Sequence, residues 1–241
     1  MPILKIGSFV ESVSIREAFT LKQRTSGKLR LAEVDTPSGT KEIDVSWLMS
    51  ASDRYKISSD LKDYVIVELP GVTVDIPNRN MDEFSYEELT SWSPMLGRIV
   101  YTSFVGKPTF QDHDNKDPSK AKGTNFDTAL LKGRSRTGKS VYQVMVLAGY
   151  DRTKDRSLVT SILSKKRRGY SMGALVDFTL CSVCGKVSSK GPKCDCMNKL
   201  GKGKVKLGKL IYDRCKGVNF IEISSVEDPA DWDSYSDSFW E

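Results

Sequence analysis

The chain has 241 residues, of which 39% are hydrophobic and 28% are charged, a composition typical of a globular protein and not of a disordered or collagen-like one. No apolar run is long enough to span a membrane, and the N-terminal sequence lacks the pattern of a secretory signal, so we expect a protein that is neither secreted nor inserted in a membrane. The single histidine, His113, excludes any mechanism or metal site that requires two.

The net charge of +6 is distributed unevenly along the sequence. Residues 1–131 carry 16 basic and 19 acidic side chains, residues 132–216 carry 21 and 5, and residues 217–241 carry 0 and 7. The basic middle could attract nucleic acid or an acidic protein surface, and the acidic end could screen it within the same chain. Charge alone therefore raises nucleic-acid binding as one functional alternative.

Short β-strands are predicted through the N-terminal part of the chain, separated by turn residues. The clearest are residues 29–34, 42–47 and 63–69. Ser85 begins the sequence Ser-Tyr-Glu-Glu, whose spacing is that of a capping box, so a short helix should start there. Residues 98–104 are then predicted to return to a strand.

One strand and the clearest helix follow. Residues 141–147 are rich in β-branched side chains and predict a strand. The helix should start at Asp155 or Ser157, place its apolar side chains on one face, and end at Gly169. The basic run 165–168 would then lie in its last turn, where cations stabilise the helix dipole, or would form a partner-binding patch.

Two more strands, residues 174–180 and 218–224, flank an insert rich in glycine, lysine and cysteine. The C-terminal residues are acidic and aromatic without periodicity, and we interpret them as a solvated tail or a docking peptide. The chain as a whole is predicted to have an α+β, mostly β fold with two or three helices.

Residues 133–140 match the phosphate-loop pattern G-x-x-x-x-G-K-S, whose backbone amides, lysine and serine could hold nucleotide phosphates and Mg²⁺. A phosphate loop requires a helix that begins at its lysine. The residues after Lys139 have the pattern of a strand instead. We therefore favour a β-hairpin with a basic turn, and a nucleotide-binding protein remains an alternative.

All five cysteines lie between residues 181 and 215. Cys181 and Cys184 form a C-x-x-C-G knuckle, and Cys194 and Cys196 follow after a short spacer. Four thiolates at this spacing predict a tetrahedral structural Zn²⁺ site, with redox-active or unligated thiols as the alternative. Cys215 could replace one ligand of the C-x-C pair. Because the ligand set would be full, the metal should fold the insert and perform no chemistry.

Two further residues occupy positions suited to catalysis. His113 stands where a predicted strand enters a polar loop, and such loops frequently carry catalytic side chains, although a lone histidine is also commonly a surface or capping residue. Ser171 lies in Gly-Tyr-Ser-Met-Gly, between the predicted helix and the next strand. A backbone N–H beside it could approach a developing oxyanion.

Three segments in order, KPTFQDHDNKDPSKAKG, GYSMGALVDF and NFIEISSVEDPADW, resemble the prohead (head maturation) proteases of tailed bacteriophages, which are related to the herpesvirus assemblins. The resemblance spans residues 98–232, and the three motifs together carry it. It implies an assemblin-like, partly open β-barrel with a few helices. The cysteine insert, for which the spacing predicts a zinc knuckle, departs from the family pattern.

The resemblance also implies a catalytic triad. The family's histidine falls on His113, with Asn115 and Gly123 in the flanking pattern, its serine nucleophile falls on Ser171, and its acid falls on Glu222. Serine chemistry is consistent with this set, because the hydroxyl needs a neutral imidazole to take its proton and the imidazole needs an acceptor on its other nitrogen. The herpesvirus branch uses a second histidine in place of the acid, and this chain has none.

The alternation of side chains along a strand supports Glu222 as the acid. In Ile-Glu-Ile-Ser, Ile221 and Ile223 should face the core while Glu222 points to the opposite side. Asp112 and Asp114 are rivals by proximity to His113. As sequence neighbours on an extended segment, they should point away from the imidazole.

The resemblance implies a viral serine endopeptidase that cleaves scaffold and capsid proteins, and itself, inside a procapsid in the host cytoplasm. Further copies of the chain are expected as a partner. Residues 1–97 would be a β-rich portion of the same fold, residues 98–232 the protease core with the zinc-knuckle insert at 181–215, and residues 233–241 an acidic tail. The alternatives are a zinc-ribbon nucleic-acid-binding protein and a phosphate-loop nucleotide-binding protein.

Overall fold

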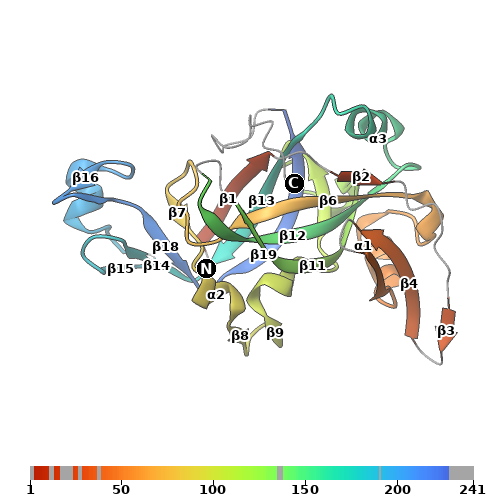
Figure 1. The fold of residues 1–241 in the computed structure, drawn as a ribbon, viewed down its shortest axis with the longest axis horizontal. Helices are drawn as coiled ribbons and strands as arrows, with labels where there is room; N and C mark the ends of the chain where they lie inside the picture. Colours follow the sequence, from red (N-terminus) through yellow and green to blue (C-terminus); the bar gives the residue numbers. More distant parts are fainter. Residues whose placement is uncertain are drawn as a thin grey trace.

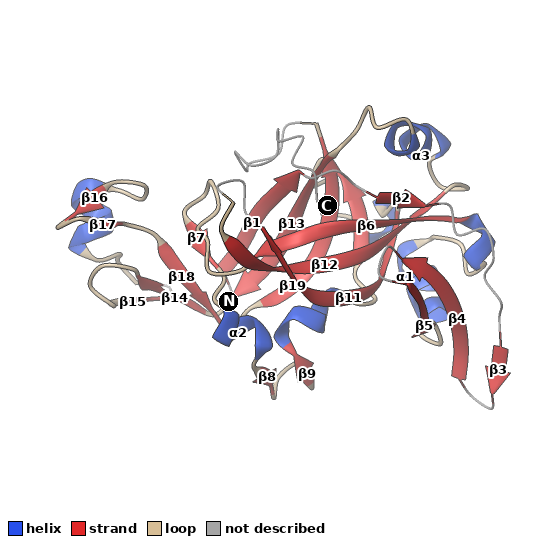
Figure 2. Ribbon diagram, in the orientation of Figure 1, coloured by secondary structure: helices blue, strands red, loops and turns tan. Residues whose placement is uncertain are grey.

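The computed structural model describes residues 3–10, 14–16, 24–26, 29–36, 39–134, 138–189 and 191–227. The predicted acidic tail at 233–241 lies outside them. Strands predominate over helices in the described part, as Figure 2 shows, so the fold is mostly β with few helices. Within the same part of the chain, no helix combines the length and the apolar character needed to cross a membrane.

A large mixed sheet forms the centre of the molecule, with the strand order β1-β13-β19-β10-β11-β12-β6-β2. Its strands are β1 (Ile3–Val10), β2 (Ser14–Arg16), β6 (Tyr64–Thr73), β10 (Pro108–Gln111), β11 (Gly123–Arg134), β12 (Ser140–Asp151), β13 (Gly169–Val176) and β19 (Asn219–Val226). Neighbours are antiparallel except β10 and β19, which are parallel. Strand β1, at one edge, also contacts β6 near the other edge, so the sheet curls back toward itself (Figure 1).

Four smaller sheets surround the large one. They contain β3 (Arg24–Ser26), β4 (Leu29–Thr36) and β5 (Gly39–Asp44); β8 (Trp92–Ser93) and β9 (Arg98–Ile99); β7 (Asp82–Glu83), β14 (Phe178–Cys181), β15 (Val187–Ser188) and β18 (Asp213–Lys216); and β16 (Val205–Lys206) with β17 (Lys209–Leu210). Residues 178–216, here called the cysteine module, extend from the large sheet toward the left of Figure 1. Strand β7 joins this module to the rest of the fold by pairing with β18.

The helices are short. They are α1 (Leu48–Tyr55), α2 (Tyr86–Thr90) and α3 (Arg156–Leu163), with 3-10 turns at Leu61–Asp63, Val100–Phe104 and Pro118–Lys120 and a π turn at Cys196–Leu200. The hydroxyl of Ser85 accepts the Glu88 N–H at 3.3 Å, and the carboxylate of Asp155 accepts the Leu158 N–H at 2.9 Å. These N-caps confirm the two helix starts that the sequence predicted.

The predicted end of α3 is wrong. The helix stops at Leu163, and Lys165 adopts a left-handed φ of 56°, which turns the chain out of the helix. Gly169, predicted to end the helix, is the first residue of β13. The basic run 165–168 therefore lies in the connection between α3 and β13 and not in a last helical turn.

The predicted strand 98–104 is correct only for its first two residues. Val100–Phe104 forms a 3-10 turn, which places Val100, Ser103 and Phe104 toward the interior. The Phe104 ring stacks on Phe220 of β19 with the ring centroids 4.0 Å apart, and the Ser103 hydroxyl accepts the Phe220 N–H at 3.0 Å. Packing against β19 thus outweighs the local preference for a strand.

The phosphate-loop motif forms the connection of a long hairpin. Strands β11 and β12 pair antiparallel along their length up to Arg134 and Ser140. Residues 135–137 of the motif lie outside the described residues. Ser140 begins β12, so the helix that a phosphate loop needs after its lysine is replaced by a strand. The prediction of a β-hairpin is confirmed.

Candidate active site and cysteine cluster

His113 is placed by a sharply turned loop at the end of β10. Asp112 and His113 both have left-handed backbone conformations, with φ of 51° and 57°. The Asp112 N–H donates to the carbonyl oxygen of Ser225 at 2.9 Å, and the Asn115 N–H donates to the carbonyl oxygen of His113 at 2.7 Å. Because β10 runs parallel to β19 at Gln111 and Ser225, this turn directs the imidazole back over the large sheet.

Ser171 lies within β13 and not at a helix-to-strand junction as predicted. It is flanked by Ser8 of β1 on one side and Ser224 of β19 on the other. The residue is 2% exposed, whereas the His113 side chain is 23% exposed. Ser171 is therefore held rigidly at the centre of three paired strands, and the imidazole forms the more accessible side of the site.

Glu222 lies on β19, directly opposite Gly173 of β13. Gly173 follows Ser171 by two residues on β13. Its carboxylate is 1% exposed and lies directly over Gly173, where an added Cβ would be 2.6 Å from Oε1. The Ser224 hydroxyl donates to Oε2 at 2.6 Å. The spacing S-x-G thus leaves room for a buried carboxylate beside the serine.

The imidazole of His113 joins the other two residues. Its Nδ1 is 2.8 Å from Glu222 Oε1, and its Nε2 is 2.6 Å from Ser171 Oγ. An ionised carboxylate can only accept, so we assign the ring proton to Nδ1, which leaves Nε2 able to accept the Ser171 O–H. This is the arrangement of nucleophile, base and orienting acid that activates a serine hydroxyl.

The rival carboxylates bind other partners. Asp112 forms an ion pair with Arg167, and Asp114 accepts from Lys120 Nζ at 2.7 Å. Of the three acids, Glu222 is the one whose oxygen faces the imidazole. Both rivals are exposed, which also makes them weaker at fixing a ring orientation.

One detail of the predicted strand around Glu222 is wrong. The pairing of β13 with β19 shifts register between Gly173 and Ala174, which leaves Ile221 without a direct partner in a β-bulge. Ile221 is consequently only half-buried, while Ile223 packs in the main core as predicted. The bulge changes the local alternation, and Glu222 is buried despite it.

The flanking Gly123 serves sheet pairing. A Cβ there would lie 1.9 Å from the carbonyl oxygen of Gly149, so only glycine permits β11 to approach β12 at this point.

Two tyrosines, Tyr150 and Tyr170, are fully buried, and burial raises their pKa above the usual value. The charge of Glu222 raises the Tyr150 pKa further, and Arg167 opposes the shift in both rings.

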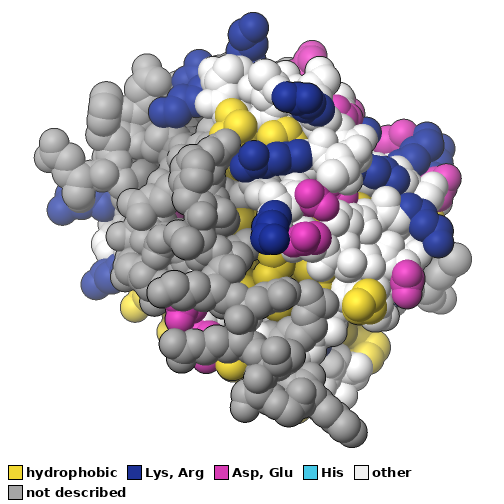
Figure 3. All heavy atoms as spheres, turned by 90° about the vertical axis from the view of Figure 1, so that its right-hand side faces the viewer, with side chains coloured by type: hydrophobic (Ala, Val, Ile, Leu, Met, Phe, Trp, Pro, Cys, Tyr) yellow, Lys and Arg dark blue, Asp and Glu magenta, His cyan; other side chains and the backbone are white. Residues whose placement is uncertain are grey.

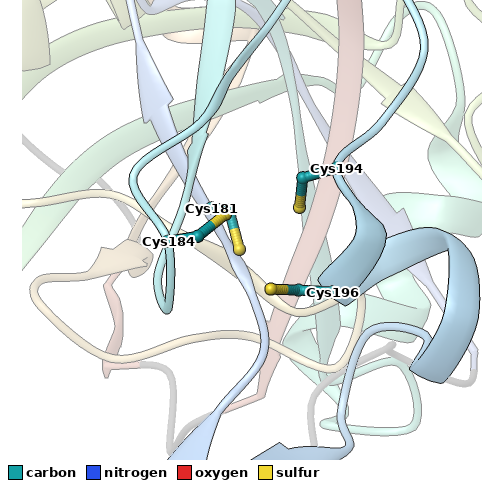
Figure 4. Close-up of side chains that lie close together, drawn as sticks. All are labelled: Cys181, Cys184, Cys194 and Cys196. Atoms are coloured by element: carbon teal, nitrogen blue, oxygen red, sulfur yellow. The ribbon is translucent and has the colours of Figure 1, made fainter.

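The cysteine module brings four thiols together. The Sγ atoms of Cys181, Cys184, Cys194 and Cys196 all lie within 4.8 Å of one another. Figure 4 shows Cys181 and Cys184 on one side of the cluster and Cys194 and Cys196 on the other; Cys181 ends β14, and Cys196 begins the π turn. These four residues could hold one metal ion. Cys215, which the sequence left as a substitute ligand, packs in the main core instead.

Charge near the cluster also suits thiolates. Lys206 Nζ lies 3.4 Å from Cys196 Sγ, and this hydrogen bond raises the pKa of Lys206. Three of the four cysteines are buried and Cys184 is exposed. A cation at this position offsets part of the negative charge that four thiolates around a divalent ion would retain.

Sequence reasoning missed two residues of the site. The role of Gly173 depends on a carboxylate from another strand, so its only sequence signal is the S-x-G spacing. Arg167 belonged to a run explained by the helix dipole, yet its side chain is buried and contacts the loop of His113. Both roles arise from contacts between residues far apart in sequence.

No family model matches the sequence, and no curated protein matches it. Among solved structures, the chain is similar to the capsid assembly protease of bacteriophage T4. The sequence identity is 12%, the TM-score is 0.44, and the match covers 93% of this chain and 98% of the T4 protein.

Proposed function

We propose that this protein is a serine endopeptidase with Ser171 as nucleophile, His113 as general base and Glu222 as orienting acid. One observation carries the proposal: the His113 ring lies at hydrogen-bond distance from both Ser171 Oγ, at 2.6 Å, and Glu222 Oε1, at 2.8 Å. His113 is the sole imidazole of the chain, so no other histidine can take this role.

The proposed reaction follows from these contacts. Ser171 Oγ attacks the carbonyl carbon of the scissile peptide while its proton passes to Nε2 of His113. The imidazolium, stabilised by Glu222, then gives this proton to the leaving amine nitrogen as the C–N bond breaks. Water attacks the acyl-enzyme with His113 again as base, which releases the acid product and restores the Ser171 hydroxyl.

The resemblance of the three sequence motifs to prohead proteases motivates the substrate class. We infer that the substrates are scaffold and capsid proteins, and the chain itself, and that cleavage takes place inside a viral procapsid. The curled large sheet would correspond to the partly open barrel of that family. Residues 1–97 would belong to the same unit, because β6 lies between β12 and β2 in the large sheet.

Time-resolved mass spectrometry tests the peptidase activity. The purified chain is incubated alone and with a proteome-derived peptide library, and new peptide ends are identified. We expect new ends with the wild type and none with Ser171→Ala or His113→Ala. Ser157→Ala, a change at an exposed serine on α3, is the matched control. Identical new ends with Ser171→Ala would contradict the proposal.

We also propose that the metal held by the cysteine module is Zn²⁺ in a structural role. Four thiolates are soft donors suited to tetrahedral zinc, and a full set of four leaves no open position for substrate. The chain's own residues perform the peptidase chemistry, and the ion would serve to fold the module.

Nucleic-acid binding is a second candidate that one feature favours. Exposed lysines gather on the cysteine module, at positions 186, 193, 199, 204 and 209. On the face of Figure 3, which lies opposite the module, basic and acidic side chains are interspersed among the described residues. Binding of a DNA duplex that weakens steeply with salt, and that disappears when these lysines become glutamine, would support this function.

A further inference from the structure

We propose that Arg167 is a positioning residue for His113, acting through Asp112 to fix the loop that carries the imidazole. The inference rests on the proposed function of the triad. It assigns a role to a residue that touches neither the serine nor the carboxylate of that triad in the described contacts.

The guanidinium makes contacts in several directions. Its Nη2 forms an ion pair with Asp112 Oδ1 and donates to the Ser225 carbonyl oxygen at 3.2 Å. Its Nε donates to Ser225 Oγ at 3.2 Å, and its Nη1 lies 3.4 Å from Glu227 Oε1. The Arg167 side chain is only 9% exposed, whereas Asp112 is 53% exposed and Glu227 is 86% exposed. The two contacts with Ser225 are therefore the better shielded ones, and the ion pair with Glu227 is an ordinary surface pair.

These contacts join the two chain segments that carry the base and the acid. Asp112 immediately precedes His113, and Ser225 lies three residues after Glu222 on β19. A planar guanidinium can satisfy a carboxylate, a hydroxyl and a carbonyl oxygen together, whereas the ammonium of lysine is a single point charge. Arg167 therefore fixes the distance between the loop of His113 and the strand of Glu222.

The loop needs such support because of its backbone. Asp112 and His113 are consecutive residues with left-handed φ, a conformation that non-glycine residues adopt only when their surroundings hold them. The hydrogen bond from the Asp112 N–H to Ser225 holds the backbone, and Arg167 holds the side chain of the same residue. Loss of the guanidinium should let the imidazole leave its position over Ser171.

The test uses the fact that His113 is the only histidine of the chain. In protein labelled with ¹⁵N-histidine and free of any tag, its two ring nitrogens give unique NMR signals that report the tautomer. Arg167→Met is compared with Arg168→Met, which removes the same charge from the adjacent exposed residue. At one neutral pH, we expect Arg167→Met to replace the single Nδ1–H tautomer by an average of both tautomers, and Arg168→Met to match the wild type.

Peptide cleavage provides the second readout. We expect Arg167→Met to lower kcat by about 10²-fold with little change in KM, because the imidazole is misplaced and not removed. Arg167→Lys should not restore the rate. Asp112→Asn should lower kcat by itself, and it should cause no further loss when combined with Arg167→Met, because Arg167→Met already removes the ion pair between the two residues.

The outcomes separate this inference from the proposed function. A wild-type tautomer and rate in folded Arg167→Met would overturn the positioning role. If Arg167→Met does not fold, Asp112→Asn takes its place, because Asp112 is exposed and its change leaves the guanidinium intact. A changed tautomer in these variants, with no peptidase activity in any protein including the wild type, would overturn the proposed function and retain the positioning role.

Discussion

At position 173, the site has room for a hydrogen atom and nothing larger. A Cβ on Gly173 would lie 2.6 Å from Glu222 Oε1 and 2.9 Å from its Cγ, well inside van der Waals contact. The carboxylate is nearly fully buried and is also held by Ser224, so it can move aside only by losing its hydrogen bonds. This glycine therefore sets the position of the Glu222 carboxylate.

We expect Gly173→Ala to lower kcat/KM for peptide cleavage by about 10²-fold, the cost of displacing a catalytic group by a fraction of an ångström to an ångström. The overpacking should also reduce the free energy of unfolding by about 1 to 3 kcal/mol. Gly191→Ala is the control, because nothing lies within 4 Å of a Cβ added there. Equal rates for both variants, measured on folded protein, would refute the assigned role of Gly173.

The sequence could predict His113, Ser171 and Glu222 as site residues because each belongs to a short motif whose order along the chain is informative. The structure places the three side chains in contact. Gly173 and Arg167 could not be assigned in the same way. Their partners, Glu222 and Asp112, lie about fifty residues away in sequence, and only the pairing of β13, β19 and β10 brings them close.

Helix α3 is fixed at its start by a carboxylate that also forms an ion pair. Asp155 caps the helix through the Leu158 N–H and accepts from Lys122 Nζ at 2.8 Å. Burial is the largest influence on this carboxyl and raises its pKa, but the hydrogen bonds from Lys122 and the backbone outweigh it, so the pKa is lowered overall. The ionised Asp155 carboxylate therefore stabilises the fold at neutral pH, and this stabilisation is lost as the pH falls through the lowered pKa.

Asp155→Asn separates the cap from the charge, because asparagine caps a helix about as well as aspartate. We expect the variant to have a free energy of unfolding about 0.5 kcal/mol lower at pH 7, the worth of a partly screened ion pair. The difference should shrink as the pH is lowered below about 4, where the carboxyl of the unfolded wild type is protonated. Urea unfolding at several pH values measures it, and a difference independent of pH would contradict the assignment.

A lysine between two carboxylates helps to join the cysteine module to β7. Lys202 Nζ lies 2.7 Å from Asp82 Oδ1 and 2.7 Å from Asp213 Oδ2, and both acids are buried. Asp82 belongs to β7 and Asp213 to β18, the two strands that pair across the junction. Removal of the cation would leave two buried negative charges facing each other.

We expect Lys202→Met to lower the free energy of unfolding by about 3 kcal/mol, the cost of breaking a buried ion pair on one side. Lys204→Met, an exposed change of the same charge, should have an effect within about 0.5 kcal/mol. Denaturant unfolding followed by tyrosine and tryptophan fluorescence measures both. Similar values for the two variants would show that Lys202 does not hold the junction.

Elements were predictable where local signals agreed with packing. The capped starts of α2 and α3 and the long strands of the hairpin β11–β12 are of this kind. Helix α1 was missed, although Leu48, Ala51 and Tyr55 form a buried face at helical spacing, because polar Ser52 interrupts the apolar stripe. Val100–Phe104 was mistaken for a strand, because its packing on β19 is not visible in the local sequence.

The mostly β character of the molecule and its cysteine cluster could be predicted from composition and spacing, whereas the order of the strands could not. The large sheet joins strands from the first and last thirds of the described chain, and β1 pairs with β13 across more than 150 residues. Such long-range pairing depends on shape and packing that a single sequence does not display.

The cysteine module extends from the large sheet and contains little hydrophobic core of its own. We expect about one equivalent of zinc per chain in protein purified without chelator, and none after Cys184→Ser, because a tetrahedral site needs all four thiolates. Chelation should lower the thermal midpoint, since ligand binding contributes folding energy to so small a module.

Cys215→Val is the control for the metal measurement. This cysteine packs in the main core and not in the cluster, so its replacement should leave the zinc content at about one equivalent. A zinc content near zero in the wild type, or an equal loss in both variants, would contradict the proposed site.

Covalent labelling with a fluorophosphonate, followed by peptide mapping, can show whether His113 activates Ser171. The reagent reacts with an activated serine hydroxyl, so the wild type should carry one adduct, on Ser171. His113→Ala should lose labelling almost completely, and Glu222→Gln should label more slowly while retaining measurable reactivity, because the acid orients the imidazole without taking the proton. An adduct on another residue, or His113→Ala labelled as fast as the wild type, would contradict the account.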